Sequence, residues 1–330
     1  MKFTPFLPHR EAVAMTVEQT IPVVNLADYD SDDPAEREAF VQKFGEGLND
    51  LGFVAVEGHG VPQELIDKNY ELFEQFFALD DETKRQYERV ETGRQRGYTP
   101  FGLEHAKDSE KPDLKEFWHV GREVEEGSLL AERMPPNVWP SEIPEFRDTA
   151  LALYDALEKS ARKMLAAVSE YLGQPAGFIP QKATDGNSII RIIHYPVCDG
   201  FDEPGAMRAA AHEDINLITL LPAATESGLE ILTRDGEWMP VPTLDGQLIV
   251  DTGDMMKRLT NDVIPATTHR VVNPAGEPKA RYSMPFFVHP HPDASLAVIE
   301  ACVPEGEEPK YEPTTADEYL QERLREIGVA

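Results

Sequence analysis

Cysteine and basic side chains are scarce in this chain of 330 residues. Its only two cysteines, Cys198 and Cys302, cannot form a disulfide framework, and reduced thiols are typical of the cytoplasm. The 31 Lys and Arg stand against 60 Asp and Glu, and the resulting formal charge of -29 repels nucleic acids and anionic lipid headgroups. The sequence shows neither a signal-peptide pattern nor an apolar run of membrane-spanning length. We therefore expect a cytoplasmic protein whose partners include neither nucleic acids nor membranes, and nothing in the sequence implies a protein partner.

Helical periodicity dominates the first half of the sequence. Apolar side chains recur every three or four residues in 31–53, 62–77 and 143–172, which predicts three amphipathic helices. Residues 89–140 are rich in charge, glycine and proline, so we expect an irregular segment there. Long loops in compact domains often carry binding residues, and we therefore place substrate contacts in this segment.

Short β-rich segments separated by turn residues begin at about residue 187. They are found at 188–195, 215–222, 229–233, 246–251, 266–272 and 281–289. No helix of crossover length lies between them, which disfavours a Rossmann sheet and favours an antiparallel sandwich or barrel. Near the end of the chain, TADEYLQERLREIG predicts an amphipathic helix.

His212 and Asp214 stand two positions apart in AHEDINL, at the start of an apolar segment. Because side chains of an extended chain alternate in direction, both point to one face. His269, 55 residues after Asp214 in a later β segment, is the candidate third ligand. Two imidazoles and one carboxylate form the facial triad of non-haem iron(II) oxygenases, although the same residue types also suit zinc. The triplet alone leaves ligation open, because His-x-Asp arises easily by chance in an acidic chain with nine histidines.

A second pair of polar side chains follows 12 residues after His269. Arg281 and Ser283 lie two positions apart in RYSMPFF and therefore share one face of a predicted strand. A guanidinium fork beside a hydroxyl is suited to a carboxylate, which it binds through charge-assisted hydrogen bonds. The combination predicts a metal site next to a site for a carboxylate-bearing ligand.

These motifs resemble those of the iron(II)- and 2-oxoglutarate-dependent dioxygenases, in the branch that includes isopenicillin N synthase. The resemblance rests on HED, THR and RYS, and it extends to TIPVVNLADY, LGFVAVEGHGVPQELID, GLEILTRDGEWMPV and DTGDMMKRLTND, over roughly residues 20–292. It implies a mainly β fold with flanking helices, whose core is a distorted double-stranded β-helix, or jelly roll. The implied division is an N-terminal helical and mixed region at 1–180, the jelly-roll domain at 181–295 and a C-terminal extension with a helix at 296–330.

The resemblance also implies roles for individual residues. The iron(II) ligands at the catalytic centre would be His212, Asp214 and His269. The distal carboxylate of the cosubstrate 2-oxoglutarate would be bound by Arg281 and Ser283, with Tyr195 in contact with the cosubstrate. Dioxygen is the implied oxidant, and ascorbate is a candidate reductant.

The implied enzyme is an oxidoreductase that hydroxylates, desaturates or cyclises a small organic substrate and releases succinate and CO2. A carboxylate at Asp214 disfavours halogenation, because related halogenases leave that position vacant for chloride. Two alternatives stay open at this point. One is an oxidase like isopenicillin N synthase, which does not use 2-oxoglutarate, and the other is a non-catalytic module that binds a metal such as zinc.

The substrate-binding residues are sought in the segment TGRQRGYTPFG. Arg94 and Arg96 lie there within an acidic chain, and one of them could pair with an anionic group of the substrate. The simpler interpretation is that both are solvated surface arginines. Apolar walls are expected from four aromatic side chains, which are Tyr98, Phe117, Trp118 and Phe287.

Overall fold

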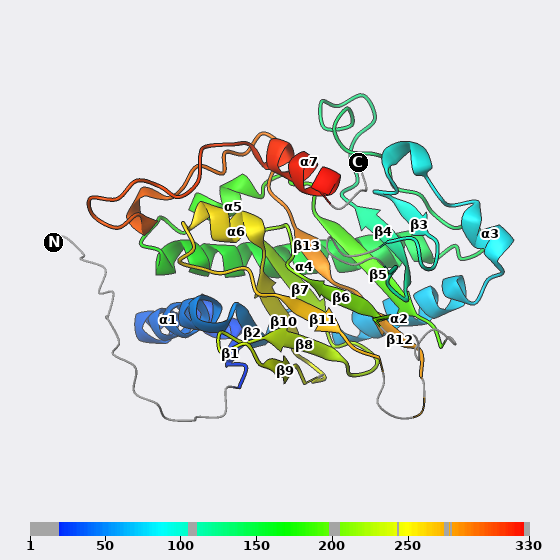
Figure 1. Cartoon of the computed structure of the whole chain (residues 1–330), viewed down its shortest axis with the longest axis horizontal. Coiled ribbons are helices and arrows are strands. Elements are labelled where there is room, and N and C mark those ends of the chain that lie inside the picture. Colours follow the sequence, from blue (N-terminus) through cyan, green and yellow to red (C-terminus); the bar gives the residue numbers. More distant parts are fainter. Residues whose placement is uncertain are drawn as a thin grey trace.

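The computed structural model describes residues 20–104, 111–197, 205–242, 244–273, 277 and 279–326. Helices and strands alternate in the first half of the chain, and strands predominate after residue 188 (Figure 1). The α-helices are α1 (Pro34–Leu51), α2 (Gln63–Phe77), α3 (Asp81–Arg85), α4 (Phe146–Tyr171), α5 (Phe178–Lys182), α6 (Asp254–Leu259) and α7 (Ala316–Glu326). The strands are β1 (Val23–Asn25), β2 (Phe53–Glu57), β3 (Gly97–Thr99), β4 (Glu116–Gly121), β5 (Ile189–Tyr195), β6 (Ala209–His212), β7 (Ile218–Pro222), β8 (Leu229–Leu232), β9 (Trp238–Pro240), β10 (Leu248–Thr252), β11 (His269–Val271), β12 (Arg281–Ser283) and β13 (Phe286–Val288).

The strands of the described residues form two sheets. The larger sheet has the order β1-β2-β10-β7-β13-β5-β4-β3, with β12 also paired to β5, and the smaller has the order β6-β11-β8-β9. Strand β1 is parallel to β2, and the other paired strands are antiparallel. The antiparallel β structure predicted for the second half of the chain is therefore confirmed. The larger sheet also includes β1–β4, so both halves of the chain share it.

Alternation along the strands gives the larger sheet two apolar faces. On β2, Val54 and Val56 enter the main core together with side chains of α1, α2 and α4. Phe53 and Ala55 point the other way, into a second core that also contains Ile231 of the smaller sheet. We call these the helix face and the inner face of the larger sheet. Two facing sheets with helices on one outer side confirm the expected jelly-roll core with flanking helices.

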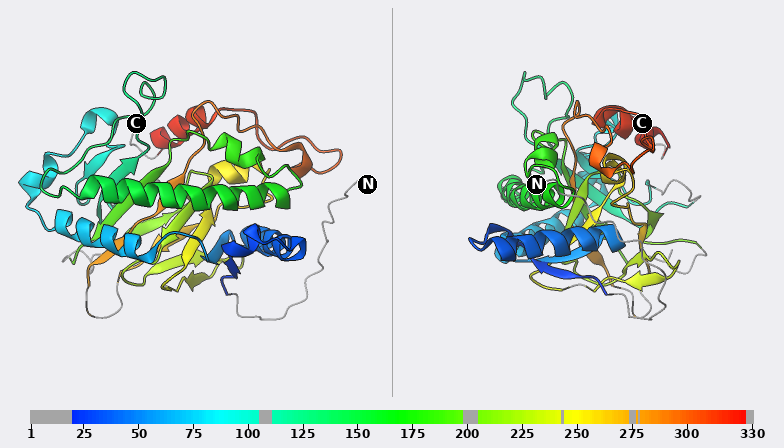
Figure 2. Two further views of the ribbon diagram at one scale, coloured as in Figure 1. Left: turned by 180° about the vertical axis from the view of Figure 1, so that it is seen from behind. Right: turned by 90° about the vertical axis from the view of Figure 1, so that its left-hand side faces the viewer.

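The three predicted amphipathic helices are present as α1, α2 and α4, and they cover the helix face (Figure 2). Helix α4 buries Leu153, Leu157, Leu165 and Val168, at the helical spacing expected from the sequence. The predicted C-terminal helix is α7. None of the described helices is long and apolar enough to cross a membrane.

Part of the segment expected to be irregular, 89–140, is in fact β structure. Strands β3 and β4 extend the larger sheet beyond β5, and every residue of β4 is buried. The prediction was wrong here because Glu116 and His119 interrupt the apolar pattern. Both are buried with polar partners instead of facing solvent, and Glu116 lies 2.9 Å from Nζ of Lys84. A strand whose polar side chains pair inside the protein has no clear hydropathy signature.

Candidate active site

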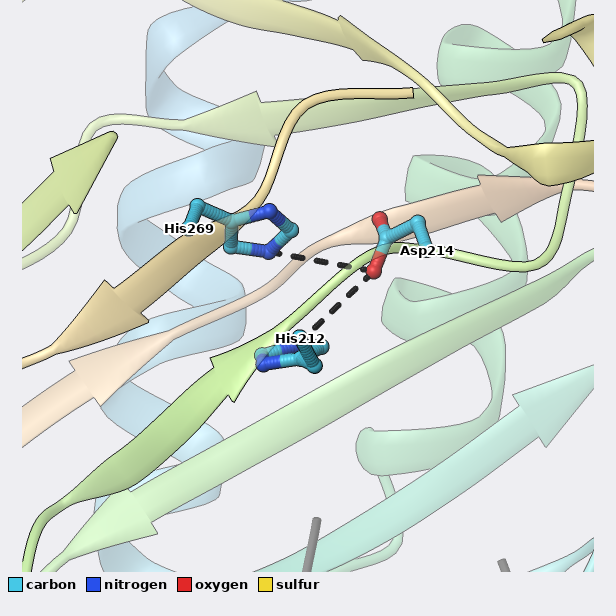
Figure 3. Close-up of side chains that lie close together, drawn as sticks. All are labelled: His212, Asp214 and His269. Atoms are coloured by element: carbon cyan, nitrogen blue, oxygen red, sulfur yellow. Dashed lines mark ion pairs between the residues drawn. The ribbon is translucent and has the colours of Figure 1, made fainter. Parts of the chain in front are cut away.

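His212, Asp214 and His269 come together at the inner side of the smaller sheet. His212 ends β6, His269 begins β11, and the two residues are directly opposite each other in the sheet register. Side chains opposite each other on neighbouring strands project to the same face. Asp214 follows β6 by two residues, and Figure 3 shows its carboxylate facing both imidazole rings.

The three side chains are close enough to share one metal ion. Their ligand atoms lie within 4.8 Å of one another. Oδ1 of Asp214 is 3.9 Å from Nε2 of His212 and 3.8 Å from Nε2 of His269. The side chain of His212 is 37% exposed, whereas those of Asp214 and His269 are 7% and 11% exposed. Solvent therefore reaches this group from the side of His212.

Backbone carbonyls determine which ring nitrogen of each histidine is available. Nδ1 of His212 lies 2.7 Å from the carbonyl oxygen of Ala210, and Nδ1 of His269 lies 3.1 Å from that of Thr267. Because a carbonyl only accepts, each Nδ1 donates, and the neutral form of each ring then carries its lone pair on Nε2. Partial burial, followed by the nearby His269, lowers the pKa of His212 below its usual value, which favours the neutral ring that metals bind.

Asp214 is oriented from the opposite sheet. The hydroxyl of Thr219 on β7 donates to Oδ2 of Asp214 and accepts in turn from Nδ2 of Asn216 at 3.0 Å. Asp251 on β10 is opposite Thr219 in the register. Burial, followed by the charge of Asp214, raises the pKa of Asp251 well above its usual value and favours its protonated form. These contacts fix one carboxylate oxygen of Asp214 and leave Oδ1 facing the histidines.

Arg281 and Ser283 form a second group on the inner face of the larger sheet. Arg281 is opposite Tyr195 of β5, and its Cζ lies 5.1 Å from the centre of the Tyr195 ring. Its Nη1 donates to Oγ of Ser283 at 3.1 Å, and its Nε donates to the carbonyl oxygen of Glu226 at 3.0 Å. The guanidinium group is therefore held in one orientation, and Arg281 is only 2% exposed. The structure brings together all three residues predicted for cosubstrate binding.

An ionic cluster lies beside β4 and β5. Nη1 of Arg191 is 3.1 Å from Oε2 of Glu104, and its Nε donates to Nε2 of His119 at 2.8 Å. Nζ of Lys115 is 2.7 Å from the same Glu104 oxygen and 2.8 Å from Oδ2 of Asp113. Burial, followed by the charge of Arg191, lowers the pKa of His119 well below its usual value, so this ring is neutral. The cluster thus pairs two cations with two anions.

Two of the four aromatic residues expected at the substrate site lie in this region. Phe117 and Phe287 flank Arg191, with ring centres 4.5 Å and 5.4 Å from its Cζ. The structure does not bring Tyr98 and Trp118 to the triad, because alternation along β3 and β4 directs both side chains to the helix face. Both belong to the main core there, and the hydroxyl of Tyr98 donates to Glu116.

The two arginines expected to contact the substrate are used in other ways. Arg94 forms an ion pair with Glu88, with Nε 2.7 Å from Oε1. Arg96 is fully buried, and its Nη2 donates to Oδ1 of Asn187 at 3.1 Å. Arg96 is therefore not a surface arginine either. Neither residue is brought to the triad by any described contact.

Three residues of this region, Arg191, His119 and His289, were not predicted from the sequence as site residues. One signal was available, because Arg191 is the one charged residue within the apolar segment SIIRIIHY. A charged side chain is rarely buried in a strand without a partner. The partners, however, come from the segment that seemed irregular in sequence.

Two family models match the chain. One is the non-haem dioxygenase in morphine synthesis N-terminal model, which matches residues 21–142. The other is the 2OG-Fe(II) oxygenase superfamily model, which matches residues 186–290 and thus includes the His-Asp-His group and the Arg281 pair.

Whole-chain comparisons agree with these models. A 2OG-Fe(II) oxygenase family protein from Caulobacter crescentus is 42% identical, with a TM-score of 0.84 over 93% of this chain and 99% of that chain. The 2-oxoglutarate-Fe(II) type oxidoreductase hxnY of Emericella nidulans is 30% identical over 91% of this chain and 88% of that protein. A full-length Neurospora crassa protein, solved in complex with alpha-KG and thymine, is 25% identical, with a TM-score of 0.84 over 96% of this chain and 99% of that chain.

Proposed function

The chain belongs to the iron(II)- and 2-oxoglutarate-dependent oxygenases, and on this premise we propose that His212, Asp214 and His269 hold the iron ion of the enzyme. The observation that carries the proposal is that Nε2 of both histidines and one carboxylate oxygen of Asp214 lie within 4.8 Å of one another. Two neutral imidazoles and one carboxylate form the donor set of non-haem iron(II) oxygenases and leave further coordination positions open. The donor atoms therefore fit the cofactor that the family uses.

Arg281 and Ser283 are proposed to bind the distal carboxylate of 2-oxoglutarate, with Tyr195 beside it. The support is a guanidinium group that is almost fully buried and oriented by two hydrogen bonds. A fixed, desolvated guanidinium favours a carboxylate through charge-assisted hydrogen bonds. The same contacts would disfavour a ligand that lacks the second carboxylate.

Iron(II), dioxygen and 2-oxoglutarate supply the oxidising chemistry, in which a C–H bond of a small-molecule substrate is oxidised and 2-oxoglutarate becomes succinate and CO2. The protein's own residues position the reactants. Thr219 and the backbone carbonyls behind the two histidines hold the ligand atoms in place. Asp214 and His269 are largely buried between the two sheets, and the centre is open to solvent on the side of His212. Hydroxylation, desaturation and cyclisation are all compatible with this arrangement, and ascorbate is the proposed reductant for iron.

The hypothesis that Arg94 or Arg96 binds an anionic group of the substrate is not supported, because both guanidinium groups have partners within the protein. The Neurospora crassa structure contains thymine, an uncharged small molecule. For this protein we therefore propose only that the substrate is a small organic molecule, which binds on the exposed side of the iron site near His212.

The function is tested by measuring succinate release and oxygen uptake with the purified iron-loaded protein and 2-oxoglutarate. Even without a substrate, an oxygenase of this family should release succinate slowly. His212→Ala should abolish this release, whereas the control His291→Ala, which replaces a histidine outside the group, should not. Oxygen uptake without succinate would support the oxidase alternative, and the absence of both would support a non-catalytic module.

A further inference from the structure

Arg191 is held in place by polar and aromatic contacts, although part of its side chain is exposed. His119 accepts from Nε, and Glu104 accepts from Nη1. The rings of Phe117 and Phe287 lie within 4.5 Å and 5.4 Å of Cζ, which is close enough for cation–π contact. The side chain nevertheless keeps 22% of its surface exposed. A preorganised donor that water can reach is a typical feature of a ligand site.

The position of Arg191 along β5 separates it from the proposed 2-oxoglutarate site. Tyr195 is opposite Arg281, and inner-face side chains of β5 then follow every second residue, so Arg191 is four residues away. Four residues of a strand span roughly 13 Å. This distance leaves Arg281 and Ser283 free to bind 2-oxoglutarate and places Arg191 beyond these two residues.

A cavity of about 180 Å³ lies beside His289. It is lined by His289, Asn187 and Met255, and α7 closes its other side. His289 lies two residues beyond Phe287, and its buried Nδ1 has no hydrogen-bond partner among the described residues. Burial lowers the pKa of His289 to about 4, and the charges of Asp214 and Arg191 act on it in opposite directions. His289 is therefore within electrostatic range of both the triad and Arg191.

Charge balance indicates what kind of group Arg191 would accept. The positive charges of Arg191 and Lys115 are already matched by those of Glu104 and Asp113, and His119 is neutral. A carboxylate bound to the same guanidinium would lie close to the carboxylate of Glu104, and it would lose its hydration on entering between the sheets. An uncharged carbonyl group accepts the same hydrogen bond without that penalty.

We propose that Arg191 anchors the substrate of this site, by donating to a carbonyl oxygen of a small uncharged molecule whose apolar part packs against Phe117 and Phe287. The inference rests on the oxygenase function proposed above and adds the class of substrate to it. A planar ring bearing an amide or imide carbonyl fits a flat guanidinium between two aromatic side chains.

The test compares uncharged probes with carboxylates of the same ring, using benzamide against benzoate and uracil against orotate. Binding is measured by isothermal titration to the protein loaded with iron(II) and 2-oxoglutarate in the absence of oxygen. In the parent protein, the uncharged probes should bind at least tenfold more tightly than their carboxylate counterparts. The second readout is the ratio of succinate release with a probe to release without it.

Arg191→Met should weaken binding of the uncharged probes by about 10- to 100-fold, the range for losing a hydrogen bond from a charged donor. Arg94→Met is the matched control and should bind them as the parent does, because Arg94 pairs with Glu88. If Arg191→Met does not fold, Arg191→Lys keeps the charge but loses the planar donor edge, and it should show the same direction of change.

Three results would overturn the assignment: tighter binding of the carboxylates, parental affinity in both Arg191 variants, or no binding by any uncharged probe. Failure of the oxygenase function itself is a separate observation. It would appear as a parent protein that releases no succinate from 2-oxoglutarate, whatever the probes do.

Discussion

Replacing Arg281 with leucine should weaken the binding of 2-oxoglutarate strongly and specifically. Arg281 is 2% exposed, and its guanidinium is oriented by Ser283 and by the carbonyl of Glu226. Removing the partner of a desolvated charge costs about 2 to 4 kcal/mol, which corresponds to about a 30- to 900-fold increase in the dissociation constant. Leucine fills part of the vacated volume and cannot donate a hydrogen bond.

The assay is isothermal titration of 2-oxoglutarate into the iron-loaded protein without oxygen. Ser283→Ala is a graded companion, because it removes the hydroxyl partner of Arg281 but leaves the guanidinium charge in place, so it should weaken binding less than Arg281→Leu does. Arg94→Leu is the control for loss of an arginine elsewhere, and it should leave the dissociation constant unchanged. An unchanged constant in Arg281→Leu, with the circular dichroism of the parent, would show that the carboxylate binds at another place.

Three further predictions concern the triad, the helix face and the cavity. The variants His212→Ala, Asp214→Ala and His269→Ala should each release no succinate and retain less iron after gel filtration. If one of them retained the iron content of the parent, the replaced residue would not be an iron ligand. Glu116→Leu leaves the 7%-exposed Lys84 without its buried partner and should lower the free energy of unfolding by about 3 kcal/mol in urea denaturation, with iron content unchanged. Burial lowers the pKa of His289 from 6.5 to about 4 in the folded protein. As the pH falls from 6.5 toward 4, this histidine therefore binds a proton in the unfolded chain before it does so in the folded protein. Stability should therefore fall as the pH drops through this window, and His289→Leu should reduce the fall; an identical pH dependence would contradict the buried, neutral state of this ring.

Much of the fold was predictable because its pattern is local. The helical spacing that predicts α4 depends only on residues three or four positions apart, and these same residues are buried in the structure. The alternation around His212 and Asp214 depends only on extended backbone, and it placed both side chains on one face. Local spacing could also join Arg281 to Ser283, because they are neighbours on one strand.

The sequence by itself therefore determined which residue types could hold a metal and a carboxylate, and where the long helices and most strands of the second half lie. Only the tertiary structure decided which face of β4 carries each side chain, and so assigned Phe117 to the inner face and Trp118 to the main core. It also decided that Arg191, and not Arg94 or Arg96, stands between the aromatic side chains expected at the substrate site. The physical reason is that a buried charge is stabilised by partners distant in the sequence, and their positions depend on strand pairing and not on local composition.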